Sequence, residues 1–208
     1  LNSSTFSLYF LLSGLFPNKL FISWESSFKL YKTFNIFESI GAVRRELRHS
    51  DFLGFLLNPS ENHGLQDVFL KKFLFDVAKK DRSIGSISPI NIDRYELLDI
   101  EVRREWKNID ILLSSEKGKF VCAVENKIDS DESANQLTKY RKIVEDEFKG
   151  YKKIYVYLTI DGVRPKKEQD QNWLSYSYAD IHLLLNSILK KTDGRIGEDV
   201  HILLKHYI

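Results

Sequence analysis

The chain has 208 residues, and its 31 lysines and arginines nearly balance its 29 aspartates and glutamates, which leaves a formal net charge of +2. This length favours one compact domain with at most a small appendage. With 43% hydrophobic and 29% charged residues, the composition excludes a disordered, collagen-like or multi-span membrane protein. The near-neutral net charge argues against a protein that binds nucleic acid through bulk positive charge alone. The single cysteine, Cys122, cannot form an internal disulfide, which favours the reducing cytoplasm.

Residues 1–33 differ in character from the rest, and we expect residues 34–208 to form the main domain. The apolar run over residues 6–16 is shorter than the roughly 20 residues of a membrane-spanning helix, and no basic segment precedes it as in a signal peptide. We therefore expect no membrane anchor, and interpret residues 1–33 as a helix or strand that packs on the domain. Because the chain begins with Leu1 and contains no methionine, a fragment and an unusual leader both stay open.

The front third of the domain has helical periodicity. Apolar residues at spacings of four, three and four predict one stripe of an amphipathic helix: Ile36, Ile40, Val43 and Leu47. A second, short helix is expected to begin with Ser50 as its cap and to end at Asn58–Pro59. A third helix is expected over residues 65–80, followed by a loop from Asp81 to Asp93.

The middle of the chain changes to the period of β-strands. Three strands are expected, over residues 97–104, 109–114 and 119–127. A helix from about 131 to 148 and a strand over 153–159 follow, and two helices, 179–191 and 198–207, end the chain. The prediction is an α/β fold with the core order α-β-β-β-α-β, in which helices flank a mixed central sheet.

Two acidic residues are expected to meet across the central hairpin. If Lys117–Gly118 form the centre of a tight turn, Asp110 lies opposite Glu125. Opposed residues of an antiparallel pair have Cβ atoms about 4.5–5.5 Å apart, so the two carboxylates would crowd together. Lys127 projects from the same face, two residues beyond Glu125.

The surroundings of this acidic pair indicate a cation. Residues 120–124 are all apolar, so both faces of their strand are expected to be buried, although a solvated strand face is the alternative for Glu125 and Lys127. A like-charge pair at about 4 Å costs on the order of 4 kcal/mol at an effective dielectric near 20, which one lysine only partly offsets. Oxygen ligands without thiolates or a histidine pair favour Mg²⁺ or Mn²⁺. Glu46 is the candidate for a further acid, and an exposed helix glutamate is its alternative.

At this point the residues resemble a known family. Ile109–Asp110, Glu125-Asn126-Lys127 and a helix with Gln136 and Tyr140 are similar to the PD-(D/E)XK nuclease superfamily, with the Gln-x-x-x-Tyr signature of its RecB-like exonuclease branch. The block from Glu46 to Gly64 also resembles a bacterial subgroup of that superfamily. The resemblance covers roughly residues 34–190 and implies the restriction-endonuclease-like fold. Ile109 departs from the proline of the superfamily's name, at a position that varies freely and touches no metal.

The resemblance implies roles for the residues of the motif. Asp110 and Glu125 would bind Mg²⁺ or Mn²⁺ together with the backbone carbonyl of Asn126. Glu46 would match the acid on the helix before the sheet and is a further metal and catalytic candidate. Lys127 would orient or help to activate the attacking water.

The neighbouring helix is the candidate for contact with a substrate. Gln136 and Tyr140 would match residues that brace the site or touch the scissile strand, with a capping amide and a core tyrosine as the alternative. The candidate nucleic-acid-binding residues are Tyr140, Lys139, Arg141, Lys142, His49 and His63. For the two histidines, a capping or packing role is the alternative.

These expectations combine into a Mg²⁺-dependent nuclease that hydrolyses phosphodiester bonds, with DNA favoured over RNA, in defence, restriction or repair. A carboxylate-bound metal supplies both things that this reaction needs, positive charge on the phosphate and a nucleophile made from water. A non-catalytic nucleic-acid- or partner-binding module that kept the nuclease fold is the alternative. A homo-oligomer or an accessory subunit of a complex also stays open.

Overall fold

The computed structural model describes residues 34–80, 92, 97–128, 135–167, 170–191 and 196–207. The chain divides into two units, Leu1–Asn35 and Ile36–Ile208, and the second carries the fold described below. Residues 1–33, and with them the expected packing of the apolar run, lie outside the described residues, so the domain boundary at residue 34 stays a prediction.

A five-stranded sheet forms the centre of the second unit, in the order β1-β2-β3-β4-β5. Its strands are β1 (Glu101–Trp106), β2 (Ile109–Ser115), β3 (Phe120–Lys127), β4 (Lys152–Thr159) and β5 (Leu174–Ser177). The first three strands form an antiparallel meander, whereas β4 runs parallel to β3 and β5 parallel to β4. The mixed sheet and the α-β-β-β-α-β order of the prediction are confirmed.

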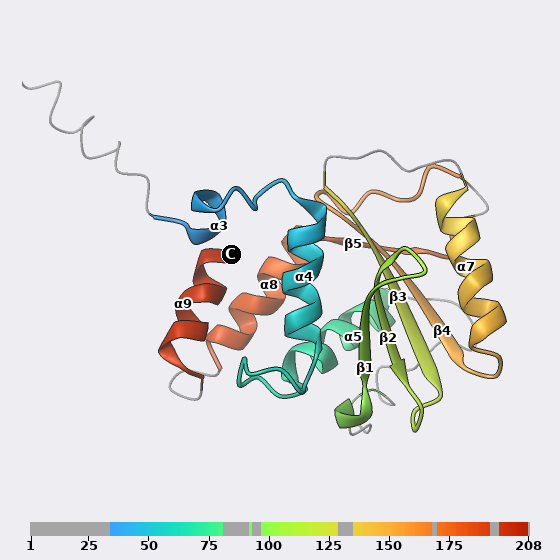
Figure 1. Cartoon of the computed structure of the whole chain (residues 1–208), viewed down its shortest axis with the longest axis horizontal. Coiled ribbons are helices and arrows are strands. Elements are labelled where there is room, and N and C mark those ends of the chain that lie inside the picture. The colour runs from blue at the N-terminus through green and yellow to red at the C-terminus, as the bar shows by residue number, and fades with distance from the viewer. Residues whose placement is uncertain are drawn as a thin grey trace, which may run out of the picture. The chain divides into compact units, whose positions relative to one another are not determined.

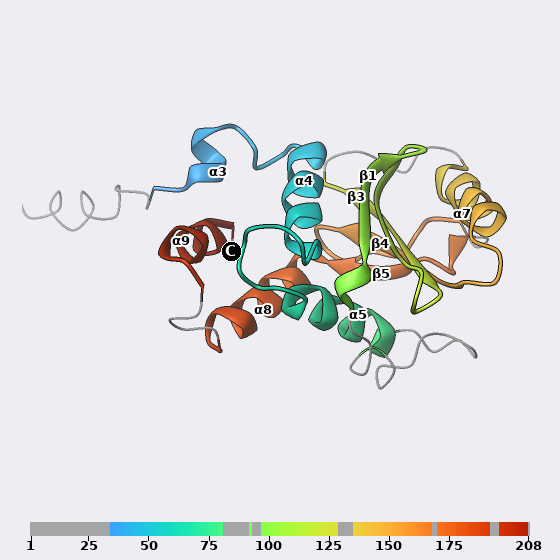
Figure 2. The ribbon, with the colours of Figure 1, turned by 60° about the horizontal axis from the view of Figure 1, so that its bottom comes forward.

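Helices cover both faces of the sheet (Figures 1 and 2). On one face lie α4 (Glu46–Leu57), α5 (Val68–Lys80) and α8 (Tyr178–Leu189), whose apolar residues join one large core cluster. On the other face, α7 (Gln136–Glu147) packs over a second cluster. Alternation along β3 explains this division, because Cys122 and Val124 enter the first cluster and Val121 and Ala123 the second. The consecutive apolar run in β3 is therefore buried on both sides.

The front of the unit differs from the prediction. Instead of one long helix there is a single turn, α3 (Ile36–Ser39), and α4 begins at Glu46, so that Ser50 lies inside α4 rather than at its cap. The predicted apolar stripe is not a buried face, since Ile40 and Leu47 are 68% and 52% exposed. Helical spacing alone misassigned these residues, because no element of the described chain covers them.

Two other elements differ as well. Residues 97–99 form a short 3-10 helix, η1 (Leu97–Asp99), before β1, and β5 had no counterpart in the prediction. The expected start of α7 near residue 131 lies outside the described residues. The remaining helix, α9 (Glu198–Tyr207), coincides with the prediction. Within the described residues, no helix combines the length and apolar character that crossing a bilayer requires.

Candidate active site

The register of the central hairpin brings the two predicted acids together. Ile111 pairs with Val124, so Asp110 and Glu125 are the next residues to face each other, as expected. The loop is longer than predicted, with residues 116–119 joining the last pair, but the register is the same. Since even-numbered β2 residues and odd-numbered β3 residues face α7, both carboxylates lie on that side.

Glu125 is the most deeply buried carboxylate of the site. The residue is 1% exposed, and its Oε1 accepts hydrogen bonds from Lys127 Nζ and Gln136 Nε2, each at 2.9 Å. Its Oε2 is buried and has no hydrogen-bond partner among the described residues. Burial, and then the charge of Asp110, raise the pKa of Glu125 to about 8. Without a cation, this carboxyl group is therefore mainly protonated near neutral pH.

Asp110 is held through the main chain around it. Its Oδ2 accepts a hydrogen bond of 2.7 Å from the backbone N–H of Asn126. Its own carbonyl oxygen accepts one of 2.8 Å from Nε of Arg104 in β1. Burial raises the pKa of Asp110 to about 6 despite the hydrogen bond from Asn126, so this group also ionises less readily than an exposed aspartate.

Glu46, the first residue of α4, reaches the end of β3. Its Oε1 accepts a hydrogen bond of 2.9 Å from the backbone N–H of Ile128, and its Oε2 lies 3.8 Å from Lys127 Nζ. Burial acts to lower the pKa of Lys127, but the charge and hydrogen bond of Glu125 outweigh it and hold the pKa above its usual value. Lys127 is therefore a firmly protonated ammonium group between two glutamates, and its side chain is 13% exposed.

Gln136 and Tyr140 lie one turn apart on α7, above the carboxylates. The Gln136 amide donates to Glu125 and also to the Tyr140 hydroxyl, at 3.0 Å. Tyr140 is 5% exposed and belongs to the core cluster under α7. Gln136 therefore braces Glu125, whereas Tyr140 supports Gln136 and is a core tyrosine, as its alternative role proposed.

Arg104 was not recognised from the sequence, although it contributes to the site. Besides its bond to Asp110, it forms an ion pair with Asp51 of α4. A Cβ atom on Gly54 would lie 2.7 Å from Cδ of Arg104, so glycine is needed where α4 crosses this side chain. Residues 46, 50 and 54 are four apart and lie on the side of α4 that faces the sheet. Glu46 was a candidate from the charge of the acidic pair and from the resemblance, but only the packing of α4 reveals the roles of Ser50 and Gly54.

The two candidate histidines are held by other groups. His63 is 0% exposed, and its two ring nitrogens form hydrogen bonds with the Asn58 carbonyl and the Leu65 amide. The ring nitrogens of His49 contact Val43 O at 2.9 Å and the Tyr207 hydroxyl at 3.0 Å. Because these nitrogens are already engaged, both histidines have packing roles and offer no free ring nitrogen to a phosphate.

Exposed basic side chains occur on and beside the elements that form the site. On α7, Lys139 and Lys142 are exposed, whereas Arg141 is half-buried and pairs with Glu145. Three further arginines lie near by in the chain: Arg44 and Arg45 directly precede Glu46, and Arg164 follows the end of β4. Arg164 is exposed, and its loop is held by a hydrogen bond from Val163 to Thr159, the β4 partner of Lys127.

The donor set suits a divalent cation of the hard, oxygen-preferring kind. Among the described residues, no three His, Cys, Asp or Glu side chains gather in a way that would hold a metal ion. The convergent side chains are the carboxylates of Asp110 and Glu125, and a buried oxygen without a partner, Glu125 Oε2, is costly unless a cation or proton reaches it. The carboxylate oxygens of Asp110 and Glu125 therefore fit a hard divalent cation such as Mg²⁺ or Mn²⁺.

Comparison with known proteins identifies the family. The model of the PD-(D/E)XK nuclease superfamily matches residues 34–208, which include the whole described fold. The chain belongs to the PD-(D/E)XK nuclease superfamily. No curated protein and no solved structure matches the chain significantly. The superfamily assignment confirms the resemblance drawn from Asp110 and Glu125-Asn126-Lys127, and the mixed sheet is consistent with the restriction-endonuclease-like fold of PD-(D/E)XK proteins.

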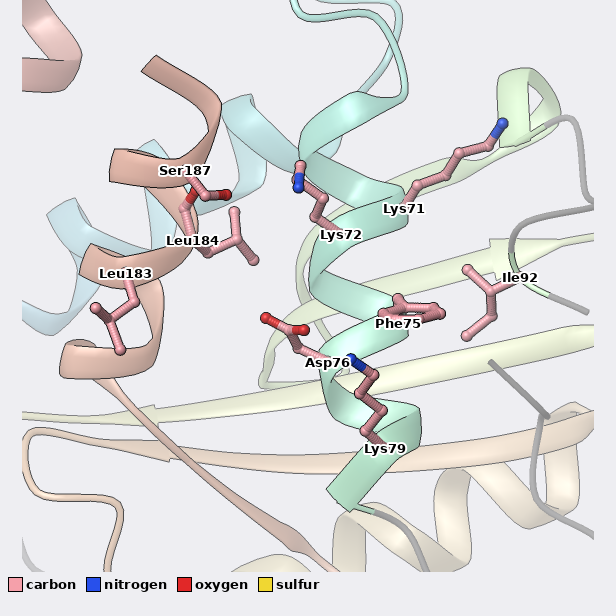
Figure 3. A pocket seen from close by; sticks show the side chains of 9 residues that line it. All are labelled: Lys71, Lys72, Phe75, Asp76, Lys79, Ile92, Leu183, Leu184 and Ser187. Carbon is pink, nitrogen blue, oxygen red and sulfur yellow. The ribbon is translucent and has the colours of Figure 1, made fainter. Parts of the chain in front are cut away.

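A separate cavity of about 550 Å³ lies between α5 and α8 (Figure 3). Phe75 and Ile92 face each other on one side of α5, and Asp76 points toward α8. The lining residues are Lys71, Lys72, Phe75, Asp76, Lys79, Ile92, Leu183, Leu184 and Ser187. None of the PD-(D/E)XK motif residues lines it, so this cavity is separate from the candidate active site.

Proposed function

We propose that this protein is a Mg²⁺- or Mn²⁺-dependent nuclease that hydrolyses phosphodiester bonds, most readily in DNA. The observation that carries the proposal is the convergence of Asp110, Glu125 and Lys127 at one end of β2 and β3, with a buried Glu125 oxygen that has no partner within the described part of the chain. Family membership supports the class of reaction. The buried thiol of Cys122 is compatible with the reducing cytoplasm that we propose as its location.

Asp110 and Glu125 are the residues that would hold the cation, with the main-chain carbonyl of Asn126. A bound divalent ion would supply positive charge to the phosphate and lower the pKa of a bound water. The binding of a cation must displace the proton that burial keeps on Glu125, so cation affinity is expected to rise with pH through the neutral range. Glu46 lies beside this pair but is engaged by Ile128, and we assign it to the orientation of Lys127.

Lys127 would act on the phosphate and on the nucleophile. Its ammonium group is fixed between Glu125 and Glu46, close to the carboxylates, and it stays protonated. A fixed ammonium donor stabilises the negative charge that develops on the phosphoryl oxygens, and it can orient an attacking water by donating a hydrogen bond. Gln136 keeps Glu125 in place through its amide.

Exposed basic side chains on and beside the elements of the site would contact the sugar-phosphate backbone. Lys139 and Lys142 lie on α7, Arg44 and Arg45 precede α4, and Arg164 lies beyond β4. Contacts from ammonium and guanidinium groups to phosphates position a strand without reading its sequence. We therefore propose nucleic acid as the partner and expect a cleavage rate that falls as the salt concentration increases.

The alternative is a binding module that kept the nuclease fold, alone or as a subunit of a larger assembly. Among the described residues, no third carboxylate joins Asp110 and Glu125 in a metal site, and this observation favours the binding module. Such a module would bind nucleic acid whether or not Asp110 can hold a cation. An intact set of Asp110, Glu125 and Lys127 argues for the enzyme instead.

Cleavage of labelled single- and double-stranded DNA and RNA, with Mg²⁺ or Mn²⁺, tests the proposal. Wild-type protein should cleave DNA, and Asp110→Asn should lose at least about a hundredfold in rate. Asp146→Asn, which changes an exposed aspartate on α7, is the matched control and should cleave normally. Equal cleavage rates for wild type and Asp110→Asn would overturn the proposal that this protein is a nuclease. Nucleic-acid binding that neither change affects, without cleavage, would favour the binding module.

A further inference from the structure

Asn126, beside the two acids in β3, is the centre of a buried hydrogen-bond network. Its side chain is 0% exposed, and Nδ2 donates to Ser50 Oγ at 3.0 Å and to the carbonyl oxygen of Glu46 at 3.2 Å. A carbonyl oxygen only accepts hydrogen bonds, so this contact determines which way the amide points. Asn126 Oδ1 therefore faces the opposite side, where it accepts a hydrogen bond of 2.9 Å from the Tyr178 hydroxyl.

The groups that hold the Asn126 side chain come from two different helices. Ser50 is fully buried in α4, one turn beyond Glu46. Tyr178 is the first residue of α8, which begins with a capping box in which the Asp180 amide donates to Ser177 Oγ and the Ser177 amide donates to Asp180 Oδ2. Since the cap fixes the start of α8, it also fixes the point from which the Tyr178 side chain reaches β3.

Two further aromatic side chains support the Tyr178 ring. The His49 ring packs edge-on against it, with ring centroids 5.3 Å apart and an angle of 85° between the planes. Burial lowers the pKa of His49, and Val43 O can only accept a hydrogen bond, so the neutral ring carries its proton on Nε2. His49 Nδ1 lies 3.0 Å from the Tyr207 hydroxyl, and this hydroxyl also forms a hydrogen bond with Tyr178. His49 and Ser50 are thus neighbouring residues of α4: His49 packs against the Tyr178 ring, and Ser50 accepts a hydrogen bond from Asn126.

The network ends on the carboxylate of Asp110. The backbone N–H of Asn126 donates to Asp110 Oδ2 at 2.7 Å, so a displacement of Asn126 moves the group that holds Asp110. We propose that Tyr178 and Ser50 are positioning residues, which set the Asp110 carboxylate for cation binding through Asn126. The cation part of this inference rests on the proposed function, whereas the hold on Asp110 does not.

The variant Tyr178→Phe removes the hydroxyl that Asn126 needs and keeps the ring. Tyr176→Phe is the matched control, because Tyr176 is two residues earlier, is also buried, and its hydroxyl has no hydrogen-bond partner among the described residues. In metal-free protein, amide hydrogen exchange measured by NMR should be at least about tenfold faster at Asn126 in Tyr178→Phe, with Val124 unchanged and no effect of Tyr176→Phe. Unchanged exchange at Asn126 would overturn the hold on Asp110.

A second arm measures Mn²⁺ affinity by calorimetry and the cleavage rate as a function of Mn²⁺. Tyr178→Phe and Ser50→Ala should each weaken Mn²⁺ binding about tenfold, as loss of groups that orient metal ligands usually does. Saturating Mn²⁺ should restore the cleavage rate to within about threefold of wild type. Wild-type affinity in both variants would overturn the positioning role. Wild-type protein that binds no Mn²⁺ would contradict the proposed function and the cation part of the inference, while amide exchange still decides the hold on Asp110.

Discussion

At the scale of single residues, the candidate site combines groups that would be unstable together without a cation. Burial and the charge of Asp110 raise the pKa of Glu125, and Lys127 offsets only part of that cost. Lys127 itself is tied to Glu125 and Glu46. A cation between the acids would replace protons, and this exchange makes measurable predictions about pH and about Lys127.

The first prediction concerns the stability of metal-free protein. The pKa values of Asp110 and Glu125, about 6 and about 8, lie above those of an unfolded chain, so the folded protein binds more protons between roughly pH 4.5 and 8. The free energy of unfolding should therefore fall as pH rises through this range. Glu125→Gln removes the larger part of this fall and should stabilise the metal-free protein at pH 8 by on the order of 2 kcal/mol.

Denaturant unfolding in EDTA at pH 5, 6.5 and 8 measures this effect. Glu145→Gln, at a side chain that is 52% exposed on α7, serves as the control and should follow wild type. If Glu125→Gln is no more stable than wild type at pH 8, burial does not raise the pKa of this carboxyl group as described.

The second prediction concerns Lys127. Lys127→Ala should reduce the turnover rate about a hundredfold, since removal of one fixed donor to a developing charge typically costs this much. Cation affinity should not fall, because no cation ligand is removed and a positive charge next to the acids is lost. Single-turnover cleavage and Mn²⁺ calorimetry separate the two quantities. Lys119→Ala, at an exposed lysine paired with Glu116, is the control, and a normal rate in Lys127→Ala would exclude the proposed role.

At the scale of elements, α4 determines the geometry of the site from the outside. Glu46, Ser50 and Gly54 lie at intervals of one turn and contact, in order, the end of β3, Asn126 and Arg104. Arg104 connects this helix to Asp110. A small shift of α4 would thus change three supports of the carboxylates together.

Arg104→Lys tests this connection. Lysine keeps the charge, but it lacks the guanidinium group with which Arg104 donates to the Asp110 carbonyl and to Asp51 at the same time. We expect a loss of about 1–2 kcal/mol in unfolding free energy, because the half-buried carbonyl oxygen of Asp110 loses its donor. We also expect weaker Mn²⁺ binding. Arg103→Lys, in which the neighbouring arginine pairs with exposed Glu101, should change neither. Identical Mn²⁺ affinity in wild type and Arg104→Lys would argue that β1 and α4 do not position Asp110.

The sequence was a reliable guide where local pattern and packing agree. The register of Asp110 and Glu125 follows from turn position and strand period, and it is found in the structure. The apolar stripe before Glu46 misled, because periodicity reports amphipathicity but not whether an element covers the face. Arg104 and Tyr178 were invisible because their roles depend on contacts with Asp51 and Asn126, which are 53 and 52 residues away in the chain.

At the scale of the whole molecule, a mixed sheet of five strands gathers residues from four separate segments at one edge. The antiparallel hairpin supplies Asp110 and Glu125, α4 supplies Glu46, and α7 supplies Gln136. The two core clusters on either side of the sheet consist of packed hydrophobic side chains, and the polar groups of the site lie at the end of β2 and β3 beside them. The PD-(D/E)XK nuclease superfamily model, which matches residues 34–208, includes all of these segments.

The most direct measurement is a crystal structure of the protein grown with Mg²⁺ and, separately, with Mn²⁺ located by its anomalous signal. The account predicts one ion that contacts oxygens of both Asp110 and Glu125, at about 2.0–2.1 Å for Mg²⁺. The account would be contradicted if, at a saturating concentration of either cation, no ion contacts these carboxylates, or the ion binds only in the cavity between α5 and α8.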